Sequence, residues 1–315
     1  MVTLNVVFQM DALEQLKPQT DSSLALIEEG IRRGHQLHYY TPSTLCWREG
    51  QLTSQVSSLA MIDEKIVEAG EKQWVDLTQF DLLFIRQDPP FNMDYLTSTY
   101  LLDHLIDKVV MINDPRGIRQ SPEKLLITHF PDLMPPTLIT RKLDMIEDFR
   151  RQHQDIVIKP LYEFGGESVV RLRPEDQNLN PIIELFEKAY PAQPWMIQKF
   201  LPQIFEGDRR LFLLEGKLIG GYSRLPMQDS IRSNNARGGK AVAVTLSARD
   251  HEIAERLEPT LKKLGLIFVG IDLIGDYLTE INVTSPTGIR VLDQLSDIKI
   301  ASIIWDKLEI KCKIV

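Results

Sequence analysis

The sequence predicts an α/β fold, in which an N-terminal doubly wound parallel sheet is followed by two smaller α+β pieces. Three observations predict it. Short apolar runs alternate with a helical pattern over the first third of the chain. A stretch punctuated by Pro and Gly, "NDPRGIRQSPEK" at 113–124, is typical of a boundary. From about residue 137 the pattern changes to short strands and short helices. We therefore expect three domains, over 1–120, 121–202 and 203–315.

In the N-terminal region the expected elements alternate between strand and helix. The first strand spans 3–9. A helix follows over 22–33, with Asp21 as its N-cap and Gly34 at its C-cap position. Apolar side chains recur along one face of this helix. Further strands are expected at 36–40, 80–87 and 109–114.

The later regions mix both element types. Ser121 is expected to cap a helix, with Pro122 at its first position and Lys124 in its first turn. Strands are expected in "TLIT", "DIVIKP", "SVVRLR" and "WMIQKFL", and helices at 181–190, 250–264 and 296–311. Pro259 is expected to kink or split the second of these helices.

Composition narrows the classes of function. The 315 residues carry a formal net charge of -8, which argues against broad nucleic-acid binding. A local cluster of Arg and Lys can still bind an anionic substrate. The two cysteines, Cys46 and Cys312, form neither a metal-ligand spacing nor a disulfide framework, so we expect a reducing cytoplasm. No apolar run approaches the roughly 18 to 20 residues of a membrane span, and "MVTLNVVFQMD" predicts a first strand rather than a signal peptide.

The stretch "GIDLIGDYLTEINVTSP" at 270–286 sets two carboxylates and an amide into two apolar strands. Glu280 and Asn282 share one face of the second strand, because side chains alternate with period two. A two-residue turn would set Asp272 opposite Thr279. A three-residue loop at 275–277, or a bulge, would set Asp272 opposite Glu280.

Convergence of the two carboxylates would favour a cation site. At about 4 Å they would repel by roughly 4 kcal/mol at an effective dielectric near 20. Oxygen ligands with no His or Cys nearby indicate Mg²⁺ or Mn²⁺ rather than zinc. The alternative is a solvated hairpin that carries scattered charge.

Several segments are suited to phosphate. Lys159 ends a strand, and the glycine-containing loop "YEFGGES" follows it at 162–168. The alternatives are a plain β-turn here and a surface lysine at Lys124. Arginines gather in the third region, where the long polar loop at 227–240 is either an active-site lid or disordered surface. No nucleophile or proton shuttle stands out, which suits chemistry by positioning and electrostatics, as in phosphoryl transfer.

Taken in order, these segments resemble the ATP-grasp ligases, and specifically bacterial glutathione synthetases. The resemblance covers nearly the whole chain. Its most specific part is "GLIFVGIDLIGDYLTEINVTSPTGIR" at 265–290, and "IRQDPPFN" and "DSSLALIEEGIRRGHQLHYY" also match. It implies an ATP-grasp architecture whose two α+β pieces clasp ATP. It also implies ligation of γ-glutamylcysteine with glycine through an acyl phosphate, with ADP and phosphate released. These are small-molecule substrates, and the family is usually a homo-oligomer, often a tetramer.

The resemblance also implies roles for individual residues. The implied metal ligands are Asp272, Glu280 and Asn282. The implied ATP-binding residues are Lys124, Lys159, Gly165, Gly166, Gln198, Lys199, Phe200 and Leu201. Catalytic positions near phosphate and substrate are Arg210, Arg224, Arg232 and Asn234. The implied substrate-binding residues are Arg86, Asp88, Ser285, Pro286, Thr287 and Gly288.

Two segments depart from the family pattern. The large lid loop has "MQDS" where the family usually has a glycine pair and a glutamate, and the small glycine loop begins with the bulkier "YEF". These departures leave two alternatives: an ATP-grasp ligase with a different acceptor amine, and an ATP-binding homologue that has lost ligation.

Overall fold

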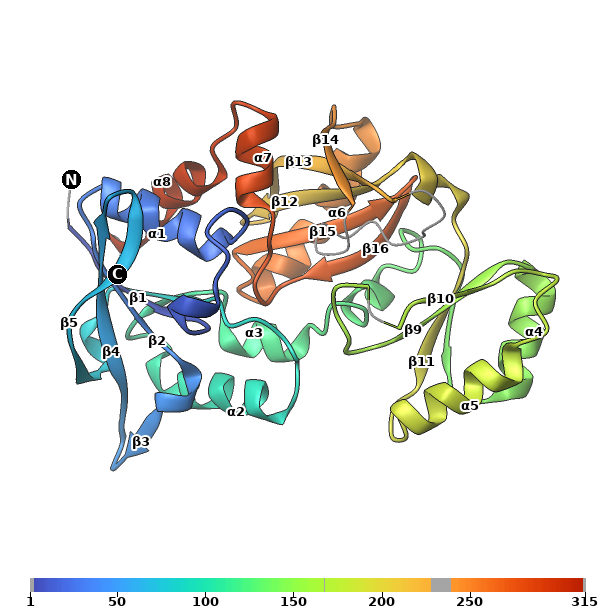
Figure 1. Cartoon of the computed structure of the whole chain (residues 1–315), viewed down its shortest axis with the longest axis horizontal. Coiled ribbons are helices and arrows are strands. Elements are labelled where there is room, and N and C mark those ends of the chain that lie inside the picture. The colour runs from blue at the N-terminus through green and yellow to red at the C-terminus, as the bar shows by residue number, and fades with distance from the viewer. Residues whose placement is uncertain (1–2, 167, 228–238, 314–315) are drawn as a thin grey trace.

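The computed structural model describes residues 3–166, 168–227 and 239–313. In these residues the strands form sheets of seven, four and five strands. Figure 1 shows the seven-stranded sheet with the first part of the chain, the five-stranded sheet beside it, and the four-stranded sheet in a separate lobe. The chain therefore builds one α/β unit and two α+β units, as the sequence predicts.

The seven-stranded sheet has a parallel centre. Its strand order is β3-β4-β2-β1-β6-β7, and β5 pairs with β4. Pairing is parallel among β1, β2, β6 and β7 and antiparallel where β3, β4 and β5 extend the sheet. The bounds are β1 Asn5–Gln9, β2 Gln36–Tyr40, β3 Cys46–Arg48, β4 Gln51–Ile62, β5 Lys65–Asp76, β6 Leu82–Ile85 and β7 Val110–Ile112.

Helices cover both faces of this sheet, which makes it doubly wound. Alternate residues of β1 enter different cores: Phe8 packs in the cluster that holds Trp305, and Val7 in the cluster that holds Tyr95. The first cluster includes α1 (Ser22–Arg32) and α8 (Ile300–Cys312), and the second includes α2 (Met93–Leu102) and α3 (Pro115–Gln120). Asp21 caps α1 by accepting a hydrogen bond from Leu24 N, as expected.

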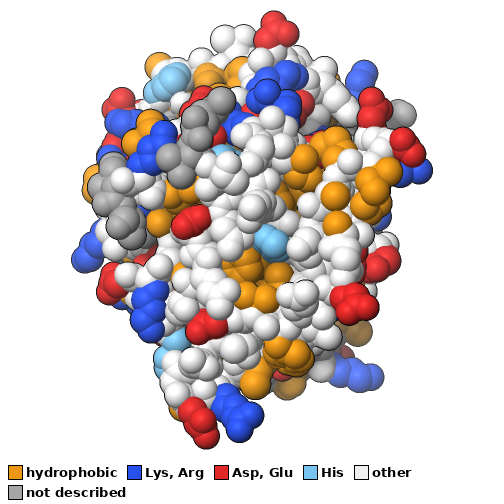
Figure 2. All heavy atoms as spheres, turned by 90° about the vertical axis from the view of Figure 1, so that its left-hand side faces the viewer, with side chains coloured by type: hydrophobic (Ala, Val, Ile, Leu, Met, Phe, Trp, Pro, Cys, Tyr) orange, Lys and Arg blue, Asp and Glu red, His pale blue; other side chains and the backbone are white. Residues whose placement is uncertain are grey.

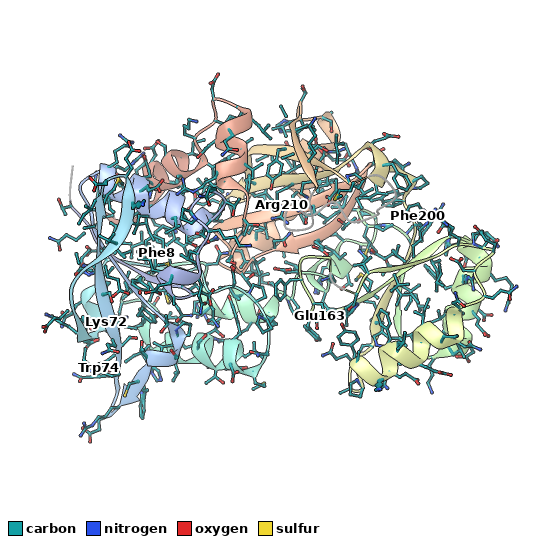
Figure 3. The ribbon with its side chains drawn as sticks, viewed as in Figure 1. Phe8, Lys72, Trp74, Glu163, Phe200 and Arg210 are labelled. Carbon is teal, nitrogen blue, oxygen red and sulfur yellow. The ribbon has the colours of Figure 1, made fainter. Side chains whose placement is uncertain are left out.

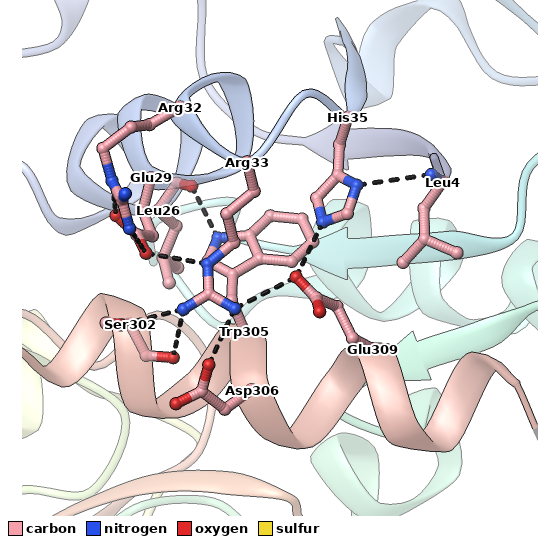
Figure 4. A network of polar contacts seen from close by, with 10 residues as sticks. All are labelled: Leu4, Leu26, Glu29, Arg32, Arg33, His35, Ser302, Trp305, Asp306 and Glu309. Atoms are coloured by element: carbon pink, nitrogen blue, oxygen red, sulfur yellow. Dashed lines mark hydrogen bonds and ion pairs between the residues drawn. The ribbon is translucent and has the colours of Figure 1, made fainter. Parts of the chain in front are cut away.

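A polar network ties α8 to α1 (Figure 4). The Arg33 guanidinium bridges Glu29 with Asp306 and Glu309 of α8, at 2.7, 2.8 and 3.0 Å. His35 Nδ1 accepts a hydrogen bond from Leu4 N, so Nε2 is the nitrogen that donates to Glu309. The last helix is thereby fixed on the first unit of the chain, although it follows the third unit in sequence.

The four-stranded sheet is antiparallel, with strand order β10-β9-β11-β8. Two amphipathic helices pack their apolar side chains in one core with those of the strands. The bounds are β8 Thr137–Thr140, α4 Leu143–His153, β9 Ile156–Pro160, β10 Val170–Leu172, α5 Leu179–Ala189 and β11 Trp195–Lys199.

The five-stranded sheet is also antiparallel, with strand order β14-β13-β12-β15-β16. Its bounds are β12 Asp208–Leu214, β13 Lys217–Leu225, β14 Lys240–Ala243, α6 Ala248–Lys263, β15 Phe268–Ile274, β16 Tyr277–Asn282 and α7 Ile289–Leu295. Short 3-10 helices lie at Leu13–Gln15, Pro42–Thr44, Leu77–Gln79, Asp103–Leu105, Leu126–His129 and Pro202–Glu206.

The expected helix after Ser121 is wrong. A helix lies before it instead, at α3, and after it residues 123–125 form a turn that leads into the 3-10 helix Leu126–His129. The backbone explains the difference, because the carbonyl of Glu123 accepts a hydrogen bond from Ile281 N of β16 at 3.1 Å. That carbonyl binds a neighbouring strand and is not used within a helix.

Two helix expectations need smaller corrections. Pro259 lies inside α6 without splitting it, since α6 runs unbroken from Ala248 to Lys263. Burial of Leu257 and Leu261 on either side of the proline stabilises the continuous helix. The expected helix at 296–311 begins only at Ile300.

Charged side chains of both signs are mixed on the surface shown in Figure 2. On the face shown in Figure 2, Lys and Arg side chains are scattered among acidic and apolar ones rather than gathered in one patch. No helix in the described parts of the chain is long and apolar enough to cross a membrane. Cys46 and Cys312 are free thiols.

Candidate active site

The β15–β16 hairpin brings the two predicted carboxylates face to face. Asp272 pairs with Glu280, and Gly270 with Asn282. The turn itself holds only Gly275 and Asp276, so a three-residue loop is wrong. The register instead shifts between Asp272 and Leu273, which leaves Thr279 as the extra residue of a bulge. The bulge alternative is therefore the one the structure confirms.

Asp272 is buried between two arginines. Arg210 of β12 binds it with both Nε and Nη2, the latter at 2.8 Å from Oδ2, and Arg224 Nη2 of β13 lies 3.0 Å from Oδ2. Asn282 Nδ2 lies 3.4 Å from the same oxygen. Burial alone would raise the pKa of Asp272, but the charges of the two arginines outweigh burial and hold it well below its usual range. Asp272 is thus a fixed negative charge.

The two lysines that were predicted to bind ATP lie near this hairpin. Lys159 comes from the four-stranded sheet, and Lys124 from the turn after α3. Lys124 Nζ lies 3.7 Å from Glu280 Oε1 and donates a hydrogen bond to the carbonyl of Glu163. Lys159, on β9, is 8% exposed. Burial lowers its pKa, as does the charge of Lys124, and Glu280 acts in the opposite direction. Within the described residues Lys159 Nζ has no hydrogen bond or ion pair, so it remains available to an anion.

The small glycine loop lies between β9 and β10. Gly165 and Gly166 have φ of +64° and +72°, which glycine adopts without strain. Glu163 of this loop lies at the edge of the lobe that faces the sheet carrying Arg210 (Figure 3). The hydrogen bond from Lys124 to its carbonyl fixes the start of the loop.

The predicted nucleotide segment covers the end of β11 and the two residues that follow it. Gln198 is buried and its Nε2 donates to Thr137 Oγ1 at 3.0 Å. The Phe200 ring is covered on one face by the Arg171 guanidinium at 3.6 Å. Lys199 is exposed, and Leu201 is buried beside these residues. In the predicted nucleotide segment Gln198, Phe200 and Leu201 are thus buried, and Lys199 is exposed.

The predicted substrate residues of the first and third units meet each other. Arg86 Nε donates to Ser23 Oγ at 3.0 Å and its Nη1 donates to the carbonyl of Pro286 at 3.1 Å. Ser285 Oγ donates to the carboxylate of Asp88. Burial raises the pKa of Asp88, although this hydrogen bond acts in the opposite direction. The loop at 285–288 is thereby tied to the N-terminal unit.

The same loop also contacts one of the two arginines, Arg210. Arg210 Nη1 donates to the carbonyl of Thr287 at 3.3 Å. Gly288 has a φ of +108°, and its N–H donates to Ser22 Oγ at 3.0 Å. Substrate candidates and metal candidates therefore form one continuous site. Arg232 and Asn234, with most of the loop at 227–240, lie outside the described residues.

One residue of this site was missed from the sequence. Glu123 is half-buried and accepts a hydrogen bond from Thr284 Oγ1 at 3.2 Å. Burial and the nearby charge of Glu280 raise its pKa to about 7, against the opposing charge of Lys124. Its position beside Lys124 in "SPEK" was the available signal, but a glutamate in an expected helix gives no reason to single it out.

The three sheets, the two lysines near the β15–β16 hairpin and the glycine loop together define the class of protein to which this chain belongs. The chain has the ATP-grasp fold, and two solved structures share it over nearly their full length. D-cycloserine synthetase DcsG has a TM-score of 0.68, 13% identity, and coverage of 96% of this chain and 100% of its own. The ATP-grasp ligase PsnB with a minimal precursor has a TM-score of 0.65, 18% identity, and coverage of 99% and 100%.

Within that class the chain belongs to the prokaryotic glutathione synthetase family. The family's N-terminal domain matches residues 4–119, and its ATP-grasp domain matches residues 123–297. A glutathione synthetase of Rhodopseudomonas palustris is 43% identical over 98% of this chain and 99% of its own length. One of Nitrosomonas europaea is 40% identical over 97% and 98%. The resemblance inferred from the sequence is confirmed.

Proposed function

We propose that this protein is an ATP-dependent ligase that joins γ-glutamylcysteine to glycine and releases ADP and phosphate. The observation that carries the proposal is a set of buried cations gathered around the β15–β16 hairpin: Lys124, Lys159, Arg210 and Arg224. A buried lysine without an ion-pair partner among the described residues, as at Lys159, favours a bound anion. Because relatives at 40–43% identity over nearly the full length are named glutathione synthetases, neither a different acceptor amine nor a loss of ligation is favoured.

The residues present fit a hard divalent cation. Two carboxylates oppose each other across the hairpin, and an amide lies on the same face. Among the residues described here, no group of three or more His, Cys, Asp and Glu could hold a metal alone. Few protein ligands suit Mg²⁺, which shares its shell with water and substrate phosphates. We infer that Asp272, Glu280 and Asn282 would hold Mg²⁺ or Mn²⁺, which when bound neutralises phosphate charge.

The proposed reaction has two steps. An oxygen of the cysteinyl carboxylate forms a bond to the γ-phosphorus of ATP, the bond from that phosphorus to ADP breaks, and ADP leaves. The neutral amine of glycine then attacks the carbonyl carbon of the acyl phosphate. The carbon–oxygen bond to phosphate breaks, phosphate leaves, and the new amide nitrogen loses a proton.

The chain's own contribution is to position these anions and to balance their charge. Lys124 and Lys159 would hold the phosphates of ATP, with the backbone N–H groups of Gly165 and Gly166 above them. Arg210 would stabilise the acyl phosphate, because Asp272 fixes its guanidinium and burial strengthens the interaction. Gln198, Lys199, Phe200 and Leu201 would line the adenine pocket. Arg224, Arg232 and Asn234 complete the proposed phosphate and substrate contacts.

The remaining substrate residues would bind the dipeptide and the acceptor glycine. Asp88 would bind an amino group of the dipeptide, and Arg86 would set the position of the loop at 285–288 through the Pro286 carbonyl. Ser285, Pro286, Thr287 and Gly288 would line the glycine site. Closure of a lid over these groups would exclude water, which otherwise hydrolyses an acyl phosphate. We further propose a cytoplasmic location and a homo-oligomeric state such as a tetramer.

The proposal is tested by ADP release in the presence of Mg²⁺, ATP, γ-glutamylcysteine and glycine, with each substrate omitted in turn. We expect full ADP release, and a product with the mass of glutathione, only with the complete set. ADP release with the dipeptide and a different amine would change the acceptor. ATP binding without turnover would overturn the proposed ligation.

A further inference from the structure

A buried side-chain amide lies where the first unit of the chain meets the third. Asn113 directly follows β7, the strand at one end of the order of the seven-stranded sheet, and is 2% exposed. Every hydrogen bond that its side chain makes among the described residues reaches the base of the β15–β16 hairpin. The hairpin that carries the proposed metal ligands is therefore attached to the first unit at Asn113.

The amide pairs with the hairpin as a strand residue would. Phe268 N donates to Asn113 Oδ1 and Asn113 Nδ2 donates to the carbonyl of Phe268, both at 2.8 Å, which is the exchange that two residues of an antiparallel ladder make. β16 ends at Asn282, opposite Gly270, before it could pair with Phe268. The other N–H of Nδ2 donates to the carbonyl of Val283 at 2.8 Å. Asn113 thus holds both strands at the point where they separate.

Both partners of the amide are joined by the chain to proposed site residues. Phe268 begins β15, and Asp272 lies further along the same strand. Val283 directly follows the proposed metal ligand Asn282 and leads into the loop at 285–288, which is proposed to line the glycine site. A shift of either carbonyl would therefore move the metal ligands or the acceptor loop.

The other side of this attachment is the unit proposed to hold the dipeptide. β7 pairs with β6, and Arg86 and Asp88 come directly after β6, which ends at Ile85. Because Asn113 is buried and follows β7 without a break, it transmits the position of these paired strands to the hairpin.

The backbone around Asn113 leaves little freedom for the two units to shift. The N–H of Asp114 donates to the carbonyl of Gly265 at 3.1 Å. A Cβ atom added to Gly117 of α3 would lie 1.9 Å from the carbonyl oxygen of Leu264, so these two backbones are in direct contact. Loss of the buried amide would leave its partners unpaired in this packed interior.

We propose that Asn113 is a positioning residue for the reaction. It sets the hairpin, with Asp272, Glu280 and Asn282, relative to the dipeptide site of the first unit, so that the activated carboxylate lies in line with the γ-phosphate of ATP. The inference rests on the proposed function. ATP itself is proposed to bind between the second and third units, so a loose attachment to the first unit should slow phosphoryl transfer without weakening ATP binding.

The test compares Asn113→Ala with Asn5→Ala. Asn5 Nδ2 also donates to a backbone carbonyl, that of Gln79 at 3.1 Å, but both residues belong to the first unit, so this variant is the matched control. For Asn113→Ala we expect kcat for glutathione formation to fall at least about tenfold, since a misplacement of about 1 Å can cost about a hundredfold. The Kd for ATP, measured by calorimetry without the dipeptide, should stay within about twofold of that of the unmodified protein. Asn5→Ala should keep both values.

The split between kcat and ATP affinity separates positioning from stability. Both variants are assayed at a temperature at which circular dichroism shows them folded. A folded Asn113→Ala protein that keeps kcat within about twofold would mean that Asn113 acts only on the fold, and would overturn the inference. A loss of ATP affinity as large as the loss of kcat would also overturn it, because the amide would then act on the ATP site rather than on the alignment of the two substrates.

A measurement on the unmodified protein needs no variant. The amide of Phe268 can exchange with solvent deuterium only when its hydrogen bond to Asn113 opens. We expect it to exchange at least about a hundredfold more slowly than the amide of Asp276 in the exposed hairpin turn. Equal exchange rates would mean that the attachment is loose and would overturn the inference, even if Asn113→Ala fails to fold. Failure of the proposed function is distinct, since the unmodified protein would then form no glutathione.

Discussion

Replacement of Asp272 by Asn is predicted to destabilise the ligand-free protein by about 3 kcal/mol. The carboxylate is 3% exposed, and its Oδ2 lies 2.8 Å from Arg210 and 3.0 Å from Arg224. At an effective dielectric near 20, each contact corresponds to roughly 6 kcal/mol of attraction before the cost of desolvation. Removal of one partner from a buried ion pair typically costs about 3–5 kcal/mol. We take the lower end, because an amide oxygen still accepts one hydrogen bond and Arg224 keeps Asp208.

The assay is urea unfolding followed by far-UV circular dichroism, with EDTA present and without ATP, so that no metal contributes. With an m-value of about 3 kcal/mol/M, the midpoint should fall by about 1 M. Asp276→Asn is the matched control, since it makes the same chemical change at an exposed position of the same hairpin. A midpoint for Asp272→Asn within 0.2 M of the control, a margin of roughly 0.5 kcal/mol, would refute the reasoning that this carboxylate is an essential buried counter-charge.

Three further predictions follow from single contacts. Lys159→Ala should raise the KM for ATP at least tenfold, measured by ADP release; an unchanged KM would remove the lysine from the ATP site. Gly288→Ala should lower the melting temperature more than Gly34→Ala, because both have positive φ but only at Gly288 would a Cβ lie 2.3 Å from the Tyr222 hydroxyl, and equal shifts would contradict this. Burial alone would raise the pKa of Glu309, but its arginine and histidine partners hold that pKa below its usual value. Its stabilising contribution is therefore present above about pH 4.3 and is lost as the pH falls further, so Glu309→Gln should flatten the acid limb of a stability-versus-pH curve, and an unaltered limb would count against the network.

The sequence predicts the elements whose signals are local. Asp21 caps α1 as expected, and the short apolar runs of β1 and β2, separated by that helix, mark the parallel centre of the first sheet. The β4–β5 hairpin was missed, because β5 is largely exposed and its polar residues give no alternating apolar pattern. The turns after Ser121 were missed because their backbone hydrogen bond comes from β16, which is distant in sequence.

In the site, too, features with local signals could be predicted from the sequence, and contacts between distant residues could not. Alternation along β16 is enough to place Glu280 and Asn282 on one face, but the position of Asp272 depends on a bulge at Thr279 that no local pattern marks. The pairing of Asp272 with Arg210 and Arg224 could not be anticipated either, because it needs the register of β12, β13 and β15 together. Residues that meet across units, such as Ser285 and Asp88, are likewise invisible to periodicity.

We propose that ATP activates the carboxylate of γ-glutamylcysteine at this site. The most direct test is transfer of oxygen-18 from a labelled cysteinyl carboxylate to the released phosphate, followed by mass spectrometry. Formation and aminolysis of an acyl phosphate predict one labelled oxygen in each phosphate released with product, while the other stays in the new amide. Phosphate that carries no label would mean that ATP is hydrolysed by water without activation of the carboxylate, and would contradict the account.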